Sequence, residues 1–277
     1  MLDVQFLVKS FMRPAVLQQC LQSIRKYYPQ PILLADDSHY FSENLLKGIA
    51  DVTYYPMPYG SGLSAGRNHL LSQVTSEYFV LLDHDQLLMN EHSIAQLFAV
   101  MQRTNATIVS GRLWDVGVPS PRAYFGHFSN RGRDILLNHY DPVLTKYHDV
   151  NSVRYCGCRY GSNFFLGRTA DFMVRKIQWD PDLKLMEHED FFLRLPDACR
   201  VVTAPDVHVR HLCCYPESKA EPEYAKYRHD PTHRERVRAK YQLKSEFFLE
   251  RHGVIYNDWR YWLFPKVRTC LKSSEPA

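Results

Sequence analysis

The sequence lacks the long apolar runs of a membrane protein. Among its 277 residues, no stretch approaches the roughly 20 uninterrupted apolar positions that a spanning helix needs. It also lacks a strong charge of either sign, because its formal net charge of +4 is too small to indicate nucleic-acid binding by itself. The first residues do not resemble a signal peptide, since Asp3, Gln5 and Lys9 interrupt their apolar run. With 45% hydrophobic and 23% charged residues, and no internal repeat, we expect an ordinary globular protein with a buried core and no nucleic-acid partner.

Cysteine occurs in an odd number, seven, and in no pattern that holds zinc. Cys156-Gly157-Cys158 and Cys213-Cys214 are tightly spaced, but neither forms the Cys-x-x-Cys pair of a zinc ribbon. We therefore expect buried free thiols in a reducing compartment; a disulfide in an oxidising compartment is the alternative. The protein is accordingly predicted to be cytoplasmic.

Over the first 110 residues, short apolar runs alternate with segments whose apolar residues recur at helical spacing. Strands are predicted at 4–8, 32–35, 52–55, 78–83 and 107–110. Three helices are predicted: one begins at Pro14, one follows the glycine-rich segment 60–68, and one spans 91–103. This alternation indicates right-handed βαβ crossovers and a mostly parallel central sheet. We expect an α/β domain over 1–215 with a nucleotide-binding half first, and a separate extension over 216–277.

The most informative motif is Asp83-His84-Asp85, directly behind the apolar run at 78–82. The two carboxylates stand where a predicted strand ends, the edge at which an α/β sheet binds its ligands. Carboxylates suit a Mg²⁺ or Mn²⁺ ion that also contacts a phosphate. Acidic pairs at strand ends also occur in ordinary loops, so the motif gains meaning only from the segments around it.

Two upstream segments carry further binding chemistry. Asp36-Asp37-Ser38 ends the second predicted strand, where a carboxylate can accept hydrogen bonds from a base or a ribose; a plain turn explains it equally well. In the segment 60–68, small residues surround Arg67, and an arginine near a helix start can bind a diphosphate in bidentate fashion. The segment matches neither a Walker loop nor a dinucleotide-binding fingerprint.

Two downstream segments add acids and histidines. Glu187-His188-Glu189-Asp190 precedes an apolar pair; one carboxylate there would stabilise a helix N-terminus, which leaves others for a general base. His208 and His211 follow an apolar strand. Such histidines are usually packed or solvated, and become ligand candidates only where carboxylates already hold a metal.

As a set, these segments resemble a GT-A glycosyltransferase of the family 2 type, with most similarity to the β-1,4-N-acetylgalactosaminyltransferases of the GM2/GD2 synthase kind. The resemblance runs from about residue 4 to 212. It is carried by Lys9-Ser10-Phe11-Met12-Arg13, Ser23-Ile24-Arg25-Lys26-Tyr27-Tyr28-Pro29, Ala35-Asp36-Asp37-Ser38, Ala65-Gly66-Arg67-Asn68, Ser72-Gln73-Val74-Thr75, Asp83-His84-Asp85, Asn163-Phe164-Phe165-Leu166 and His188-Glu189-Asp190-Phe191-Phe192.

The resemblance implies an inverting transfer of a sugar, a HexNAc or a hexose, from a UDP-sugar to a hydroxyl of a glycan or glycolipid. By the same resemblance, Phe11 and Asp37 would contact the uracil, and Arg67 the diphosphate side. A sugar-1-phosphate nucleotidyltransferase is a rival, but it needs a glycine-rich loop after the first strand, where this chain has Lys9-Ser10-Phe11-Met12-Arg13.

The resemblance also implies a metal and a base. Asp85 would hold Mn²⁺ or Mg²⁺, with Asp83 near the ribose or the metal and His211 completing the ligands. Asp190 would be the catalytic base, and Glu189 would contact the donor or acceptor sugar. A non-catalytic glycan-binding relative is the second rival, and it should have lost the acids at 85 or 190.

Two departures from the family pattern matter. The middle of the acidic motif is His84, where a further acid is common, and the N-terminal membrane anchor of the animal Golgi enzymes is not seen. We therefore expect a bacterial-type enzyme of surface polysaccharide or lipooligosaccharide synthesis, acting at the cytoplasmic face of the inner membrane.

The extension 216–277 is rich in basic and aromatic residues. Lysines and arginines crowd the stretch 226–244, and Trp259, Tyr261, Trp262 and Phe264 follow. Packing on the main domain explains this composition, and so does peripheral attachment to an anionic membrane surface, where cations meet headgroups and aromatic rings lie at the interface.

Overall fold

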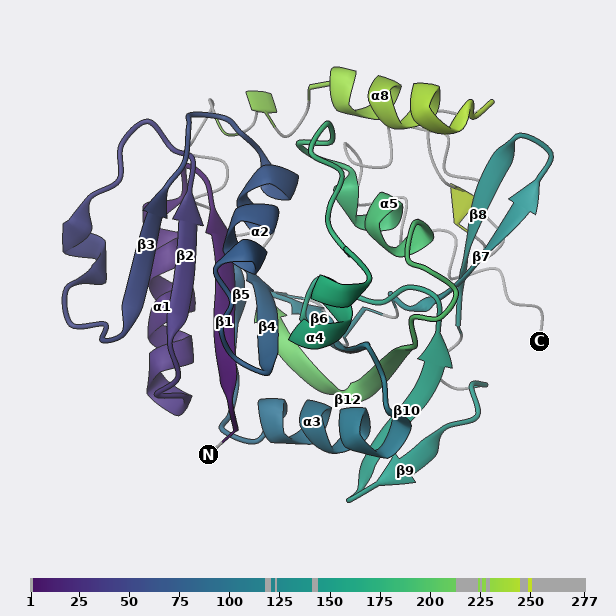
Figure 1. Cartoon of the computed structure of the whole chain (residues 1–277), viewed down its shortest axis with the longest axis horizontal. Helices are drawn as coiled ribbons and strands as arrows, with labels where there is room; N and C mark the ends of the chain where they lie inside the picture. The colour runs from purple at the N-terminus through teal and green to yellow at the C-terminus, as the bar shows by residue number, and fades with distance from the viewer. Residues whose placement is uncertain are drawn as a thin grey trace.

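A computed structural model of the chain describes residues 2–117, 121–122, 124–140, 144–212, 224, 226–227, 230–244 and 249–250. The strands of its main sheet are β1 (Val4–Ser10), β2 (Ile32–Asp36), β3 (Val52–Pro56), β4 (Tyr78–Asp83), β5 (Gln86–Leu87), β6 (Ile108–Asp115), β9 (His148–Val150), β10 (Val153–Cys158), β11 (Phe165–Arg168) and β12 (Val201–His211). They form one ten-stranded sheet in the order β3-β2-β1-β4-β11-β6-β12-β10-β9, with β5 paired to β12 (Figure 1).

The first half of this sheet is parallel. β1 pairs with β2 and β4, and β2 pairs with β3, all in parallel register. Further along, β12 is parallel to β6, whereas β11 runs antiparallel between β4 and β6, and β10 runs antiparallel to β12. The predicted α/β architecture with a mostly parallel central sheet is confirmed.

Helices cover both faces of the sheet (Figure 1). Besides a short 3-10 helix at Glu43–Leu46, they are α1 (Pro14–Tyr27), α2 (Leu63–Ser72), α3 (Ser93–Thr104), α4 (Thr169–Val174) and α5 (Glu187–Leu193). Successive strand side chains point to opposite faces, so Phe6 and Val8 of β1 join the core formed with α1 and α3, and Leu7 joins the core formed with α2 and α5. All of β1 is buried, which explains why Phe6, Leu7 and Val8 are apolar on both faces of the strand.

The described part of the extension lies on the main domain. Helix α8 (Thr232–Tyr241) follows the sheet in sequence, and its Lys240 and Tyr241 side chains both contact Asp190 of α5. A second, three-stranded sheet in the order β13-β8-β7 consists of β7 (Gly126–Arg131), β8 (Asp134–His139) and β13 (Leu249–Glu250). The aromatic residues at 259–264 lie outside the described residues, so membrane attachment and the domain boundary at 215 stay predictions.

Four of the seven cysteines are described, and all four are free and buried, as predicted: Cys20, Cys156, Cys158 and Cys199. Burial raises the pKa of the Cys156 thiol to about 11, so it is protonated and unreactive at neutral pH. Within the described part of the chain, every helix falls short of the length and apolarity that crossing a membrane requires.

Candidate functional site

The candidate site lies where the carboxyl ends of β1, β2 and β4 meet. Parallel register places Lys9 of β1 opposite Asp83 of β4, and Ser10 opposite Asp36 of β2. A pocket opens at this edge, the usual place for a ligand in an α/β sheet. It is lined by Lys9, Phe11, Asp37, Gly60, Gly62, Leu63, Asp83, His84, Asp85, Lys184, Leu185, His211, Tyr224, Tyr227 and His233. The structure thus brings together five predicted site residues: Phe11, Asp37, Asp83, Asp85 and His211.

Asp37 lies at the pocket with both carboxylate oxygens engaged. Oδ1 is ion-paired with the buried Lys9 ammonium, and Oδ2 accepts the backbone N–H of Gly62 at 2.7 Å. Gly62 has a φ of +93°, which favours glycine at this turn. Burial lowers the pKa of Lys9, and the charge of Asp37 opposes that shift. Asp37 therefore anchors the loop in front of the pocket; its predicted contact with uracil stays a prediction.

Aromatic rings gather around Phe11 at the mouth of the pocket. Its ring centroid lies 5.9 Å from that of Tyr59, 5.1 Å from Tyr227 and 6.4 Å from Tyr224. Tyr224 and Tyr227 belong to the extension, which the sequence had assigned a role away from the site. Such a cluster offers flat apolar faces on which a nucleobase can stack.

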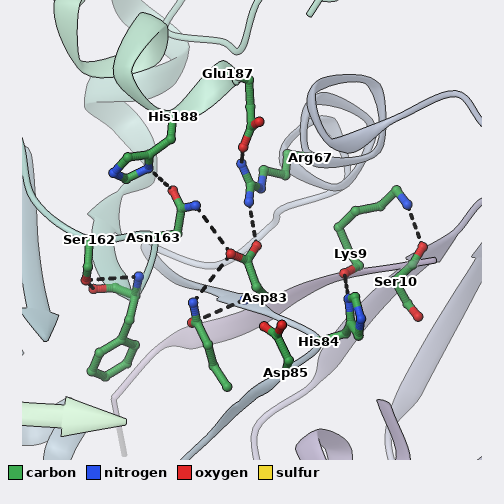
Figure 2. A network of polar contacts seen from close by, with 12 residues as sticks. Lys9, Ser10, Arg67, Asp83, His84, Asp85, Ser162, Asn163, Glu187 and His188 are labelled. Carbon is green, nitrogen blue, oxygen red and sulfur yellow. Dashed lines mark hydrogen bonds and ion pairs between the residues drawn. The ribbon is translucent and has the colours of Figure 1, made fainter. Parts of the chain in front are cut away.

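Arg67 does not line the pocket, and its predicted contact with a diphosphate stays a prediction. Its side chain is fully buried, and its guanidinium donates to Asp83 Oδ1 and to Glu187 Oε1, each at 2.5 Å (Figure 2). The sequence could not show this, because the partner Glu187 is 120 residues away. Arg67 ties α2 to β4 and α5 and so fixes the position of Asp83.

The second oxygen of Asp83 takes part in another chain of contacts. Oδ2 accepts the Asn163 amide N–H at 3.3 Å, and the Asn163 amide oxygen faces Nδ1 of His188 (Figure 2). Burial lowers the pKa of His188 to about 4, so its ring is neutral at pH 7. Nε2 of this ring has no hydrogen-bond partner among the described residues. Sequence reasoning passed over His188 because it stands among three acids.

Asp85 and His211 face each other at the end of the pocket. Asp85 Oδ1 lies 3.6 Å from His211 Nε2, and Asp85 Oδ2 accepts Arg13 Nη1 at 2.9 Å. His211 Nδ1 lies 2.7 Å from Asp115 Oδ1. Although burial opposes the shift, hydrogen bonds from His211 and Arg122 lower the pKa of Asp115 to about 2. His208, the other candidate histidine, instead packs its ring against Trp114.

The residues present fit a divalent cation held jointly with a substrate. Among the described residues, no three His, Cys, Asp or Glu side chains converge as a ready metal cage. Asp85 and His211 offer one carboxylate oxygen and one imidazole nitrogen. Mg²⁺-type sites often use one or two protein ligands and take the rest from substrate phosphates and water. Asp83, whose oxygens contact Arg67, Asn163 and Gln86, is better placed to orient the loop than to bind metal.

The predicted catalytic acids on α5 lie outside the pocket lining. Glu189 accepts the hydroxyl of Tyr124. Asp190 is fully buried and accepts Arg194 Nε at 2.7 Å, Lys240 Nζ at 2.5 Å and the Tyr241 hydroxyl at 2.6 Å. Asp190 is thus held by three donors, two of them cations. Its role as base stays a prediction.

Gly66 permits a close approach of α2 to β1, and we expect Gly66→Ala to destabilise the protein by about 1–3 kcal/mol. Alanine normally stabilises a helix relative to glycine by about 1 kcal/mol. Here a Cβ would lie 2.2 Å from Cδ of Lys9, whose ammonium is held by Asp37. Urea unfolding measures the change, with Gly157→Ala, where a Cβ meets nothing within 4 Å, as the control. A higher midpoint for Gly66→Ala would contradict this reading.

Known proteins resemble this chain over most of its length. The family model described as glycosyl transferase family 2 matches residues 6–165. The β-1,4 N-acetylgalactosaminyltransferase 2 of Mus musculus is 32% identical over 232 residues, which cover 81% of this chain and 43% of the relative. The β-1,4 N-acetylgalactosaminyltransferase 1 of Homo sapiens is 30% identical over 256 residues, covering 87% and 45%. The chain thus spans less than half the length of these curated relatives.

Solved structures share the fold. A crystal structure of S. aureus TarS 1–349 superposes with a TM-score of 0.55 at 15% identity, covering 88% of this chain and 73% of that one. The same protein in complex with UDP-GlcNAc gives a TM-score of 0.55 over 76% of this chain and 58% of that one. At this identity the likeness shows the fold alone, and it confirms the expected GT-A architecture. Since the family match covers more than half of its residues, the chain belongs to glycosyl transferase family 2.

Proposed function

We propose that this protein transfers a sugar from a UDP-sugar to a hydroxyl of a glycan or glycolipid acceptor, in a metal-dependent reaction that inverts the anomeric centre. The observation that carries the proposal is the facing pair Asp85 and His211, 3.6 Å apart, in the same pocket as the aromatic cluster around Phe11. The facing pair can hold a metal ion together with the diphosphate of the donor, and the aromatic cluster can hold the nucleobase. Names of relatives and neighbours support the donor class: two are N-acetylgalactosaminyltransferases, and TarS was solved with UDP-GlcNAc.

The residues of this chain would divide the work. When bound, Mn²⁺ or Mg²⁺ would act as a Lewis acid that neutralises charge developing on the leaving diphosphate. Asp85 and His211 would hold it, and Arg13 would keep the Asp85 carboxylate in place from the other side. Arg67 and Asn163 would keep Asp83 oriented at the sugar side of the pocket.

The acceptor side of the proposal centres on α5. Asp190 is the base predicted from the sequence, with Glu189 on a sugar, and His188 is a further candidate because its Nε2 lacks a partner among the described residues. Because Nδ1 of this neutral ring faces the Asn163 amide oxygen, a proton would be accepted at Nε2.

The wider setting is part of the proposal. Family membership disfavours the nucleotidyltransferase rival, and the acids at 85 and 190 are present, which disfavours a non-catalytic glycan-binding role. We place the reaction in surface polysaccharide or lipooligosaccharide synthesis at the cytoplasmic face of the inner membrane. The basic extension would supply peripheral attachment to anionic lipid.

A panel of nucleotide sugars tests the donor class. We expect the purified protein with Mn²⁺ to release UDP from UDP-GalNAc, UDP-GlcNAc, UDP-galactose or UDP-glucose by slow hydrolysis, and to leave GDP-mannose intact. UDP release by coupled assay and UDP affinity by calorimetry are the measurements. A protein that neither binds UDP nor hydrolyses any UDP-sugar would overturn the proposed function.

A further inference from the structure

The register of the sheet brings Asp115 beside His211, although they are 96 residues apart in the chain. An irregularity between Thr203 and His208 shifts β12 along β6, after which His211 pairs with Asp115 in parallel register. On its other side His211 pairs with Gln86 of β5, the residue after Asp85. One strand end thus places His211 between a carboxylate at the pocket and a carboxylate behind it.

The direction of the hydrogen bond behind His211 follows from the chemistry of its partner. Asp115 Oδ2 accepts Arg122 Nε at 2.5 Å, so the carboxylate is charge-paired, and a carboxylate in that state can only accept hydrogen bonds. The hydrogen must therefore be on Nδ1 of His211, which lies 2.7 Å from Asp115 Oδ1. In the neutral ring this leaves the lone pair on Nε2.

That lone pair faces another acceptor. Nε2 of His211 lies 3.6 Å from Oδ1 of Asp85. A cation bound at this point of the pocket would take one ligand from each residue. The arrangement has the form of a carboxylate–histidine–metal relay, in which an outer carboxylate fixes the tautomer and ring orientation of a ligand.

We propose that Asp115 is a positioning residue of the metal centre: it fixes the Nδ1–H tautomer and the ring orientation of His211, so that Nε2 faces Asp85 as the second protein ligand. The inference rests on the metal dependence in the proposed function. Arg122 supports it from outside by holding the second oxygen of Asp115. Loss of such an outer partner typically weakens metal binding about 10- to 100-fold.

The test compares Mn²⁺ affinity in the wild type and in Asp115→Asn. Titration of Mn²⁺ into the UDP-saturated protein, followed by the electron paramagnetic resonance of free Mn²⁺, gives the dissociation constant. We expect Asp115→Asn to weaken it about 10- to 100-fold, because the asparagine amide can turn its N–H₂ toward Nδ1 and move the hydrogen to Nε2. Asp206→Asn, which alters a carboxylate on β12 that is paired with Arg154 outside the pocket, should leave the affinity unchanged.

A second readout does not need the metal. In metal-free protein held at a pH where the ring is neutral, ¹⁵N shifts of the His211 ring should show the Nδ1–H tautomer in the wild type and a shift toward Nε2–H in Asp115→Asn. Should Asp115→Asn fail to fold, Arg122→Gln, at a half-exposed position, should weaken Mn²⁺ binding in the same direction by a smaller factor.

The outcomes separate this inference from the proposed function. Equal Mn²⁺ affinity and an unchanged tautomer in Asp115→Asn would overturn the positioning role and leave metal dependence standing. A wild type that binds UDP and hydrolyses UDP-sugars without binding Mn²⁺ would overturn metal dependence, and this inference with it, while the donor class would stand.

Discussion

Asp85→Asn is expected to lower sugar transfer by about 10²-fold or more, because a metal at a leaving group contributes several kcal/mol to the transition state. Asparagine keeps an oxygen that can accept Arg13, so the buried arginine retains a partner, but the charge that holds the cation is lost. Asp85→Ala should abolish transfer and also leave the buried Arg13 without this partner. The rate of UDP release with Mn²⁺ and saturating UDP-sugar is the measurement.

The matched controls are metal removal and a neighbouring histidine. EDTA should abolish UDP release by the wild type, and added Mn²⁺ should restore it. His208→Gln should retain activity, because that ring packs on Trp114 rather than lining the pocket. Full activity of the wild type in EDTA, or full activity of Asp85→Asn, would contradict the assignment of Asp85 as a metal ligand.

Asp190→Asn is expected to affect both stability and rate. Asp190 is fully buried and accepts three hydrogen bonds, two of them from cations, and each bond to a charged group contributes about 1.5–3 kcal/mol. Because Arg194 and Lys240 reach solvent and can rehydrate, we expect a net loss of about 3 kcal/mol in the free energy of unfolding. At temperatures where the variant stays folded, turnover should fall by about 10² or more with UDP affinity nearly intact, as for a lost general base.

Urea unfolding and turnover separate the two effects. Asp180→Asn, which removes the other and less buried partner of Lys240, should cost under about 1 kcal/mol and leave turnover unchanged. An unchanged unfolding midpoint for Asp190→Asn would contradict the structural role. If Asp190→Asn lost little turnover while Glu189→Gln or His188→Gln lost most of it, the catalytic base would be the residue changed in that inactive variant.

Sequence patterns predicted the strands and the acidic motif because these depend on local order. A short, continuous apolar run such as 78–82 favours a buried strand, and the carboxylates that follow it then lie at the ligand edge of the sheet. The family followed from several such motifs in one order. The direction of Arg67 could not be predicted, since it depends on Glu187 closing a buried ion pair from another helix.

Two other features depend on how distant segments meet. Asp115 gave no signal as a site residue, because its place beside His211 follows from a shift in the pairing of β6 and β12. Tyr224 and Tyr227 belong to the extension, for which composition left packing on the main domain and membrane contact open, and they line the pocket. In the sequence they stand apart from the aromatic residues at 259–264.

The order of the strands has a consequence for synthesis on the ribosome. The four strands of the nucleotide side, β3-β2-β1-β4, are complete once residue 83 has emerged. His211 arrives later, on β12, and Lys240 and Tyr241, two of the partners of Asp190, arrive last, on α8. Long-range pairings of this kind form late, because a long loop must close first. A nascent chain can thus shape half of its pocket while the facing pair of Asp85 and His211 is still incomplete.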